Sequence, residues 1–298
     1  MMAYNNITVA GGGTIGSQIA YMCAFHGKNT TIWGFDEKSV ELAKNFTKQW
    51  AKAVQDYTHC SDDKIKNAAN HLSYNTDLKA ATHDADLMIE AVPEDLKIKR
   101  GFYENFSKVN DNPHMDLATN TSSMLPSMMA DATDRPNRFL ACMFANHIWA
   151  NNTAEIMPHP GTDKDMPGEM AQFAREIGML PIILKKEQSG MLSNALVIPF
   201  LEAGASLWVN GVADPQTIDK AWMASCGAPT GPFAMLDMFG IRTPYDIAKM
   251  RAGKDPEMAK IAAAFKKMID AGKTGRESGE GFYKYPNPAF EDPNFLKA

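Results

Sequence analysis

Residues 7–36 follow the order strand, glycine turn, helix, strand and acid. The apolar run Ile7–Ala10 leads into a turn with three spaced glycines, and a helical pattern follows directly. A second strand candidate ends on Asp36, twenty residues after Gly16. When a helix joins two strands, the strands lie parallel to each other, because a crossover of this length returns the chain to the same end of the sheet. The stretch therefore predicts the start of a parallel α/β sheet.

The glycines have the spacing G-x-G-x-x-G. Gly11 permits a tight turn, Gly13 lets the backbone approach a pyrophosphate, and Gly16 lets helix and strand pack closely. The helix N-terminus at Thr14 and Ile15 offers unpaired N–H groups to an anion. A glycine-rich turn by itself is more often only a turn. The strand before it, the helix after it and the distant acid together favour a dinucleotide site.

The acid also bears on which dinucleotide is bound. Asp36 is placed to accept hydrogen bonds from the adenosine ribose, and its charge would repel a 2′-phosphate. The next residue is Glu37, and Lys38 is the one cation nearby. The sequence therefore predicts NAD rather than NADP.

Charge and composition exclude several classes of protein. The chain has 298 residues, which favours two domains, and a net charge of -5, which argues against binding to nucleic acid or to an anionic membrane surface. No apolar run approaches the ~18 residues of a membrane span, and no secretory signal pattern is visible. The four cysteines include no C-x-x-C pair, so we expect no metal site and reduced thiols in a cytoplasmic protein.

Strand and helix patterns alternate up to residue 184, which predicts a doubly wound, Rossmann-type parallel sheet. Ligands of such sheets lie at the carboxyl ends of the strands, where Glu94, Asn120 and Ser122 fall. Beyond Lys185 the pattern is almost continuously helical. We therefore predict a dinucleotide-binding domain over residues 1–184 and an all-α domain over 185–298. The strands are expected at 7–10, 30–35, 71–75, 86–92, 115–119, 139–144, 153–157 and 179–184.

The order of motifs resembles the L-3-hydroxyacyl-CoA dehydrogenase family, which includes 3-hydroxybutyryl-CoA dehydrogenases. The resemblance implies an NAD-binding domain, a helical domain that forms a homodimer, and a small-molecule substrate between them, with a CoA thioester as one candidate. It rests on the following segments: Gly11–Gly16, Asp36, Glu90-Ala91-Val92-Pro93-Glu94, Asn120-Thr121-Ser122-Ser123, Phe144-Ala145-Asn146, Glu155, Asn194, Gly231-Pro232-Phe233 and Gly279-Glu280-Gly281-Phe282-Tyr283.

The resemblance also assigns site residues. Ser122 and Asn194 match residues that hold the reacting oxygen and the thioester region of the substrate, and Glu155 matches the carboxylate that orients a catalytic histidine. The residues that match contacts to NAD are Asp36, Glu94, Lys99 and Asn146.

The chain departs from the family at the histidine itself, because that position is occupied by Met143. A thioether cannot accept the hydroxyl proton that an imidazole, with a pKa of about 6.5, removes from a secondary alcohol. One hypothesis is that His147, in the loop after Asn146, supplies or relays the proton with Glu155 as partner. An exposed loop histidine without a catalytic task is an equally good interpretation.

Two classes of function stay open from the sequence. The first is an NAD-dependent dehydrogenase of a 3-hydroxyacyl-CoA or of a smaller 3-hydroxy acid without CoA. The second is an NAD-binding homologue of low or no activity, which Met143 would explain. Ser122, Glu155 and Asn194 favour the enzyme. Lysines on the helical stretch after Asp36 fit a phosphate-bearing substrate, but a solvated charged face explains them as well.

Overall fold

The computed structural model describes residues 4–297, and the chain forms two compact units that divide between Ser193 and Asn194. The sequence prediction placed the division after residue 184. The last strand of the sheet ends at Ile183, and the segment that follows it still contacts the first unit, as described below. We call the two parts unit 1 and unit 2.

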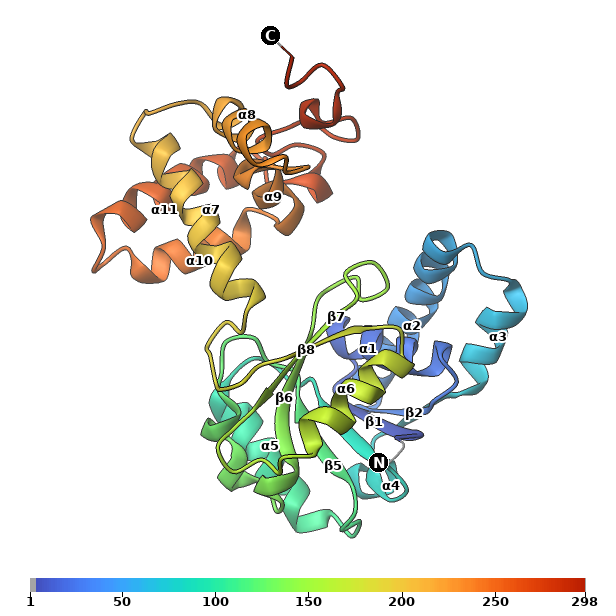
Figure 1. Ribbon diagram of the computed structural model, residues 1–298. Coiled ribbons are helices and arrows are strands. Elements are labelled where there is room, and N and C mark those ends of the chain that lie inside the picture. The colour runs from blue at the N-terminus through green and yellow to red at the C-terminus, as the bar shows by residue number, and fades with distance from the viewer. Residues whose placement is uncertain (1–3, 298) are drawn as a thin grey trace. The chain divides into compact units, whose positions relative to one another are not determined.

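Unit 1 contains one eight-stranded sheet with the order β3-β2-β1-β4-β5-β6-β7-β8 (Figure 1). All neighbouring strands pair in parallel except β6 and β7, which form an antiparallel pair. The fold class predicted from the alternation of strands and helices is confirmed. The strands are β1 Asn6–Ala10, β2 Asn29–Trp33, β3 Leu72–Asn75, β4 Leu87–Glu90, β5 Asp116–Thr119, β6 Phe139–Phe144, β7 Thr153–Pro158 and β8 Leu180–Ile183.

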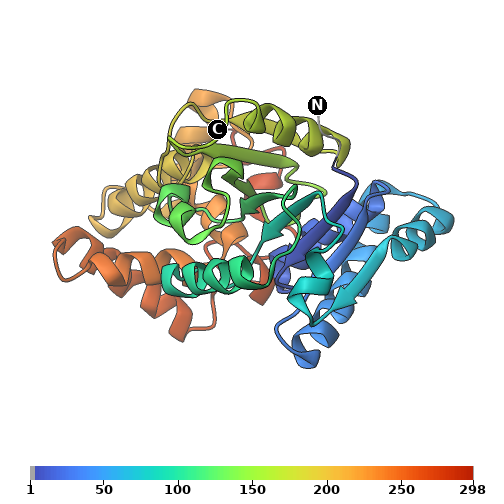
Figure 2. The same ribbon diagram turned by 90° about the horizontal axis from the view of Figure 1, so that it is seen from below.

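Helices cover both faces of this sheet, as Figures 1 and 2 show from two directions. One apolar core joins the sheet to α1, α2, α3 and α6, and a second core joins the opposite face to α4 and α5. Apolar residues on both faces explain why the central strands are apolar throughout instead of alternating. The helices are α1 Thr14–Phe25, α2 Glu37–Thr58, α3 Asp62–Asn70, α4 Leu78–Thr82, α5 Leu96–Val109 and α6 Met166–Glu176.

Short polar side chains begin four of these helices. The side chains of Asp36, Ser61, Asp77 and Asp95 each accept a hydrogen bond from a backbone N–H in the first turn of α2, α3, α4 and α5. Such caps satisfy N–H groups that have no partner within the helix. Helix α1 differs, since Gly13 precedes it and gives no side-chain cap. Its first N–H groups therefore stay open to a ligand.

Unit 2 consists of helices packed around their own apolar core. Two buried carboxylates organise it: Asp219 accepts the N–H groups of Phe233 and Ala234, and Asp237 accepts those of Phe282 and Tyr283. Burial raises the pKa of both carboxyls. The helices are α7 Ser193–Val209, α8 Pro215–Cys226, α9 Pro232–Phe239, α10 Arg242–Arg251 and α11 Pro256–Asp270.

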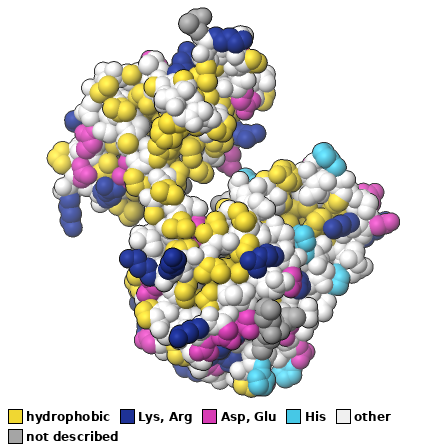
Figure 3. All heavy atoms as spheres, in the orientation of Figure 1, with side chains coloured by type: hydrophobic (Ala, Val, Ile, Leu, Met, Phe, Trp, Pro, Cys, Tyr) yellow, Lys and Arg dark blue, Asp and Glu magenta, His cyan; other side chains and the backbone are white. Residues whose placement is uncertain are grey.

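Unit 2 exposes many apolar side chains, which gather on the face seen in the upper part of Figure 3. Helix α7 is mostly apolar, yet of the described residues it buries only Leu201, Gly204 and Ala205. Leu196 on α7 is 74% exposed and Met250 on α10 is 80% exposed. Within residues 4–297, no helix is long and apolar enough to cross a membrane.

Candidate active site

The glycine turn after β1 has the geometry that its sequence predicts. Gly11 has a φ of 114°, and a Cβ atom on Gly16 would lie 1.9 Å from the carbonyl oxygen of Gly11. Substitution at Gly16 would therefore push helix α1 away from the strand. A Cβ atom on Gly13 would meet nothing within 4 Å, so this residue faces open space. Gly13 and Thr14 are exposed, which leaves the N-terminus of α1 accessible to a phosphate group.

Asp36 lies just past the end of β2 and begins α2. Its carboxylate accepts the backbone N–H of Ser39 at 2.7 Å, while the Ser39 hydroxyl accepts the backbone N–H of Asp36 at 3.0 Å. The hydrogen bonds from Ser39 lower the pKa of this carboxyl, so it is ionised at neutral pH. The residue is exposed, and an ionised, exposed carboxylate is suited to accept from ribose hydroxyls.

A buried ion pair lies at the end of β4. Lys99 Nζ donates to Glu90 Oε1 at 2.7 Å, and both side chains are fully buried. Burial raises the pKa of Glu90, and Lys99 opposes that shift. The hydroxyls of Thr119 and Tyr103 donate to the second oxygen of Glu90. A buried pair of this kind costs desolvation energy, but its hydrogen bonds fix the strand end in one arrangement.

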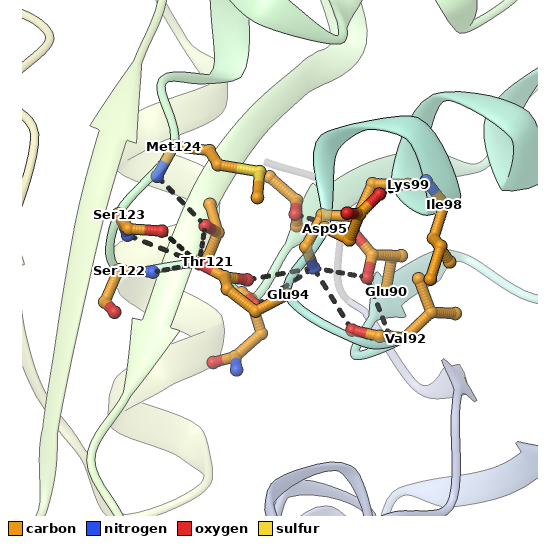
Figure 4. A network of polar contacts seen from close by, with 12 residues as sticks. Glu90, Val92, Glu94, Asp95, Ile98, Lys99, Thr121, Ser122, Ser123 and Met124 are labelled. Carbon is orange, nitrogen blue, oxygen red and sulfur yellow. Dashed lines mark hydrogen bonds and ion pairs between the residues drawn. The ribbon is translucent and has the colours of Figure 1, made fainter. Parts of the chain in front are cut away.

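Glu94 joins the loops that follow β4 and β5 (Figure 4). Its Oε1 accepts from the hydroxyl of Ser123 at 2.8 Å and from the backbone N–H groups of Ser122 and Ser123 at 3.3 Å each. Lys99 Nζ lies 3.4 Å from Glu94 Oε2. Burial acts to raise the pKa of Glu94, but Thr121, Lys99 and Ser123 stabilise the anion and bring the pKa below its usual range. The loop with Ser122 is thereby held at the carboxyl edge of the sheet.

The ends of β5 and β6 are joined as well. Asn120 Oδ1 accepts the backbone N–H of Phe144 at 3.0 Å. The hydroxyl of Ser122 takes part in none of the hydrogen bonds found among residues 4–297, and the residue is half-buried. A hydroxyl that is oriented by its backbone and is free to donate can bind a substrate oxygen.

Met143 lies directly opposite Glu155 in the antiparallel pair of β6 and β7. Side chains of directly opposed residues lie on the same face of a sheet, so these two are neighbours. Met143 belongs to a small apolar cluster, which we call the methionine cluster. Its buried members are Ala141, Met143, Met157, Leu184 and Met191.

Glu155 is fully buried, and its carboxylate binds backbone groups. It accepts the N–H of Leu192 at 2.6 Å and that of Ser193 at 3.2 Å and 3.3 Å. These groups stand at the start of α7. Asn194 is the next residue, in the first turn of that helix, and is half-buried.

The loop between β6 and β7 contains Asn146 and His147, both exposed. His147 has a φ of 55°, which is unusual for a residue with a side chain. Its backbone N–H donates to Gln18 Oε1 at 2.7 Å, and its ring packs against Trp149 at a centroid distance of 5.6 Å. Among the described residues, no hydrogen bond or ion pair joins His147 to Glu155. Their pairing stays a prediction that nothing in the structure tests.

Both halves of the chain match models of one family. Residues 6–188 match the model described as 3-hydroxyacyl-CoA dehydrogenase, NAD binding domain, and residues 190–285 match that of the 3-hydroxyacyl-CoA dehydrogenase, C-terminal domain. The chain belongs to the 3-hydroxyacyl-CoA dehydrogenase family. The predicted family, the NAD cofactor and the enzyme class are confirmed. Like its relatives, the chain is an NAD-dependent dehydrogenase-type enzyme.

Relatives in this family are similar over nearly their whole length. The 3-hydroxybutyryl-CoA dehydrogenase of Mycobacterium tuberculosis is 30% identical, with 95% of this chain and 99% of the relative covered. The mitochondrial hydroxyacyl-coenzyme A dehydrogenase of Sus scrofa is 29% identical, with 94% and 91% covered. A solved structure of a diketoreductase with dual catalysis of dicarbonyl compounds is 41% identical, with a TM-score of 0.92 and 96% and 100% coverage.

The residues of this family member fit NAD. The open space at Gly13 and the uncapped N-terminus of α1 suit the pyrophosphate, and the ionised Asp36 suits the ribose. Within residues 4–297, His, Cys, Asp and Glu side chains form no group of three or more that could hold a metal ion.

Three structural contributors were not predicted as site residues. Glu90 holds Lys99, Thr121 supports Glu94, and Gln18 holds the loop of His147. Gln18 had one signal in the sequence, because it is a polar residue in a mostly apolar helix. The structure shows that its side chain is only 1% exposed. A buried amide in such a helix needs a distant partner, which the sequence alone does not name.

Proposed function

We propose that the chain uses NAD to interconvert a 3-hydroxyacyl thioester and its 3-keto form. The observation that supports this best is the match of both halves of the chain to one family. The resemblance of the sequence assigns Ser122 and Glu155 to the substrate site. In unit 1 the glycine turn, Glu94, Ser122 and Met143 all stand at the carboxyl edge of the sheet. That edge is where doubly wound sheets bind ligands.

The residues of the chain have distinct tasks in this proposal. The N–H groups at the start of α1 bind the pyrophosphate, and Asp36 accepts from the ribose. Asn146 stands where the family contacts the cofactor, which supplies or accepts the hydride when bound. The Ser122 hydroxyl binds the reacting oxygen of the substrate, and Asn194 binds near the thioester. Met143 closes this part of the site to water with an apolar surface.

Among residues 4–297, the residue paired with Glu155 across the two strands is Met143, which has no imidazole. General acid–base catalysis typically contributes about 10² to 10⁴ in rate, so turnover is expected to be slow for this family. A 3-keto thioester is itself a 1,3-dicarbonyl compound, and the second carbonyl withdraws electrons from the reacting one. Because the reacting carbonyl is activated in this way, its reduction depends less on proton transfer from a side chain of the protein.

A second candidate is the reduction of a dicarbonyl compound without CoA. The diketoreductase, at 41% identity, is the specific observation in its favour. The same electron-withdrawing effect applies to any 1,3-dicarbonyl substrate, whether or not a CoA group is attached.

The test is NADH oxidation with acetoacetyl-CoA, free acetoacetate and a simple 1,3-diketone, with NADH binding measured in parallel. Turnover with acetoacetyl-CoA supports the first candidate. Turnover with only the free compounds supports the second. NADH binding without turnover of any substrate would contradict both and identify a binding protein without dehydrogenase activity.

The role of position 143 has its own test. We expect Met143→His to raise turnover by about 10²-fold, because an imidazole beside Glu155 restores a proton acceptor. We expect His147→Ala to leave turnover unchanged, because the ring packs on Trp149. A large loss in the His147→Ala variant would instead support proton relay by His147.

We also propose that the chain forms a homodimer through unit 2. The exposed apolar side chains of α7 and α10 support this, since a soluble monomer seldom exposes large apolar areas.

A further inference from the structure

The segment Gln188–Ser193, which leads from the sheet into α7, contacts the loop of Ser122 and the carboxylate of Glu155. The Ser189 hydroxyl donates to the carbonyl of Ser123 at 2.9 Å, and the N–H of Gly190 donates to the carbonyl of Ser122 at 2.9 Å. The segment then reaches Glu155 through Leu192 and Ser193. We call it the linker segment.

The middle of the linker segment is a strained turn. Gly190 and Met191 have φ values of 80° and 50°, and the second is costly for a residue with a side chain. Met191 is nevertheless fully buried in the methionine cluster that includes Met143. Such a conformation persists only where its surroundings fix it. Packing on the cluster and the hydrogen bonds to Ser122 and Glu155 are those surroundings.

We infer that Glu155 in this chain is a positioning residue that holds the linker segment against the sheet, with Met191 packed in the same cluster as Met143. The linker segment in turn supports the backbone of Ser122, which binds the reacting oxygen in the proposed function. The expected effect on turnover therefore rests on the proposed dehydrogenase function. Its structural part concerns only the contacts of Glu155.

The hydrogen bonds that the Glu155 carboxylate accepts distinguish this positioning role from the role of orienting a catalytic histidine. The N–H of Leu192 donates to Oε2 at 2.6 Å, and the N–H of Ser193 is shared between the two oxygens, at 3.2 Å from Oε1 and 3.3 Å from Oε2, so that Oε2 is within reach of both donors. A single acceptor oxygen can therefore hold the linker segment without a negative charge. A partner for an imidazolium needs the charge itself.

Two substitutions separate the two roles. Glu155→Gln keeps an acceptor oxygen and removes the charge. Glu155→Met keeps the length of the side chain and removes the acceptor, and its thioether resembles those of the adjacent cluster. The amides of residues 190–193 are followed by hydrogen exchange in the full-length protein, and kcat, KM and the Kd of NADH are measured with the best 1,3-dicarbonyl substrate. Circular dichroism confirms that each variant is folded.

We expect Glu155→Gln to keep the protection of these amides and to keep kcat within about threefold, because one neutral acceptor replaces one charged acceptor. We expect Glu155→Met to speed exchange at Leu192 and Ser193 at least about tenfold, because two half-buried hydrogen bonds lose their acceptor. Turnover of the Glu155→Met variant should also fall. The Kd of NADH should stay unchanged, because the linker segment makes no hydrogen bond to the glycine turn among the described residues.

Two results would overturn the inference. One is unchanged protection of Leu192 and Ser193 in Glu155→Met, which would show that Glu155 does not hold the linker segment. The other is equal loss of turnover in the Gln and Met variants with the amides of the Gln variant still protected, which would assign the charge to proton transfer. If the wild type turns over no substrate, the proposed function fails, and hydrogen exchange still decides the role of Glu155.

Discussion

At the scale of single residues, Asp36 combines two tasks in one carboxylate. One oxygen closes a reciprocal cap with Ser39 at the start of α2, and the ionised group faces solvent where the ribose is expected. The hydrogen bonds from Ser39 depress the pKa in the folded protein. A depressed pKa means that the cap stabilises the fold above the unfolded pKa of about 3.9 and that this contribution disappears as pH falls through the folded pKa.

Asp36→Asn should separate the two tasks. Asparagine caps helices about as well as aspartate does, so the melting temperature should fall only slightly, by the contribution of the lost charge. The preference for NADH over NADPH should fall at least about tenfold, because the repulsion of a 2′-phosphate is removed. Binding of both cofactors, followed by fluorescence titration, measures this. The matched control is Ser39→Ala, which breaks the reciprocal cap and should lower stability while cofactor preference stays the same.

At the scale of elements, α1 connects the glycine turn to the loop between β6 and β7. Gln18 Oε1 accepts the N–H groups of His147 and Ile148 at 2.7 Å and 3.3 Å. Trp50 of α2 donates to the Ser17 hydroxyl at 2.8 Å and packs on Trp149 of the same loop. Two helices next to the cofactor site therefore hold the loop that contains Asn146.

Gln18→Met removes the acceptor and keeps the size of the side chain. We expect a loss of about 1 to 3 kcal/mol in the free energy of unfolding, because two backbone N–H groups lose their partner. Weaker NADH binding should accompany it, since Asn146 lies in the released loop. Urea denaturation and NADH titration measure the two effects.

His147→Gly is the control for the loop. It removes the ring and permits the positive φ, so its stability should stay within about 1 kcal/mol of wild type. If Gln18→Met proved no less stable than His147→Gly, the hydrogen bonds of Gln18 would be unimportant for the loop.

The order of elements was predictable from the sequence because each element is encoded locally. The glycine spacing, apolar strands and polar caps are all patterns within about ten residues. The contacts that define the site are different in kind. Gln18 and His147 are 129 residues apart, and Glu155 reaches Leu192 only because β7 pairs with β6 and the linker segment turns back. Such contacts depend on strand register and buried packing, which local patterns do not specify.

At the scale of the whole molecule, the exposed apolar surface of unit 2 has to be explained. Helix α7 is mostly apolar, with few polar side chains such as Asn194 and Glu202, and a helix of this kind is normally buried. Leu196 and Met250 are among the most exposed apolar residues of the chain. We attribute this exposure to a second copy of the chain.

The double variant Leu196→Glu/Met250→Glu should dissociate the homodimer, because charged side chains resist burial without a partner. Sedimentation velocity should show a dimer for wild type and a monomer for the variant. Leu180→Glu on the exposed edge strand β8 of unit 1 is the control and should stay dimeric. A monomeric wild type would contradict the proposed homodimer.

The hydrogen bonds of Glu155 have a consequence for how related sequences are interpreted. An acid that secures a turn of the backbone has a task in the fold that does not depend on a histidine across the strand pair. The presence of glutamate at this strand position is then a weak marker of imidazole chemistry in related sequences. The informative position is the one directly across the strand pair, which in this chain is Met143.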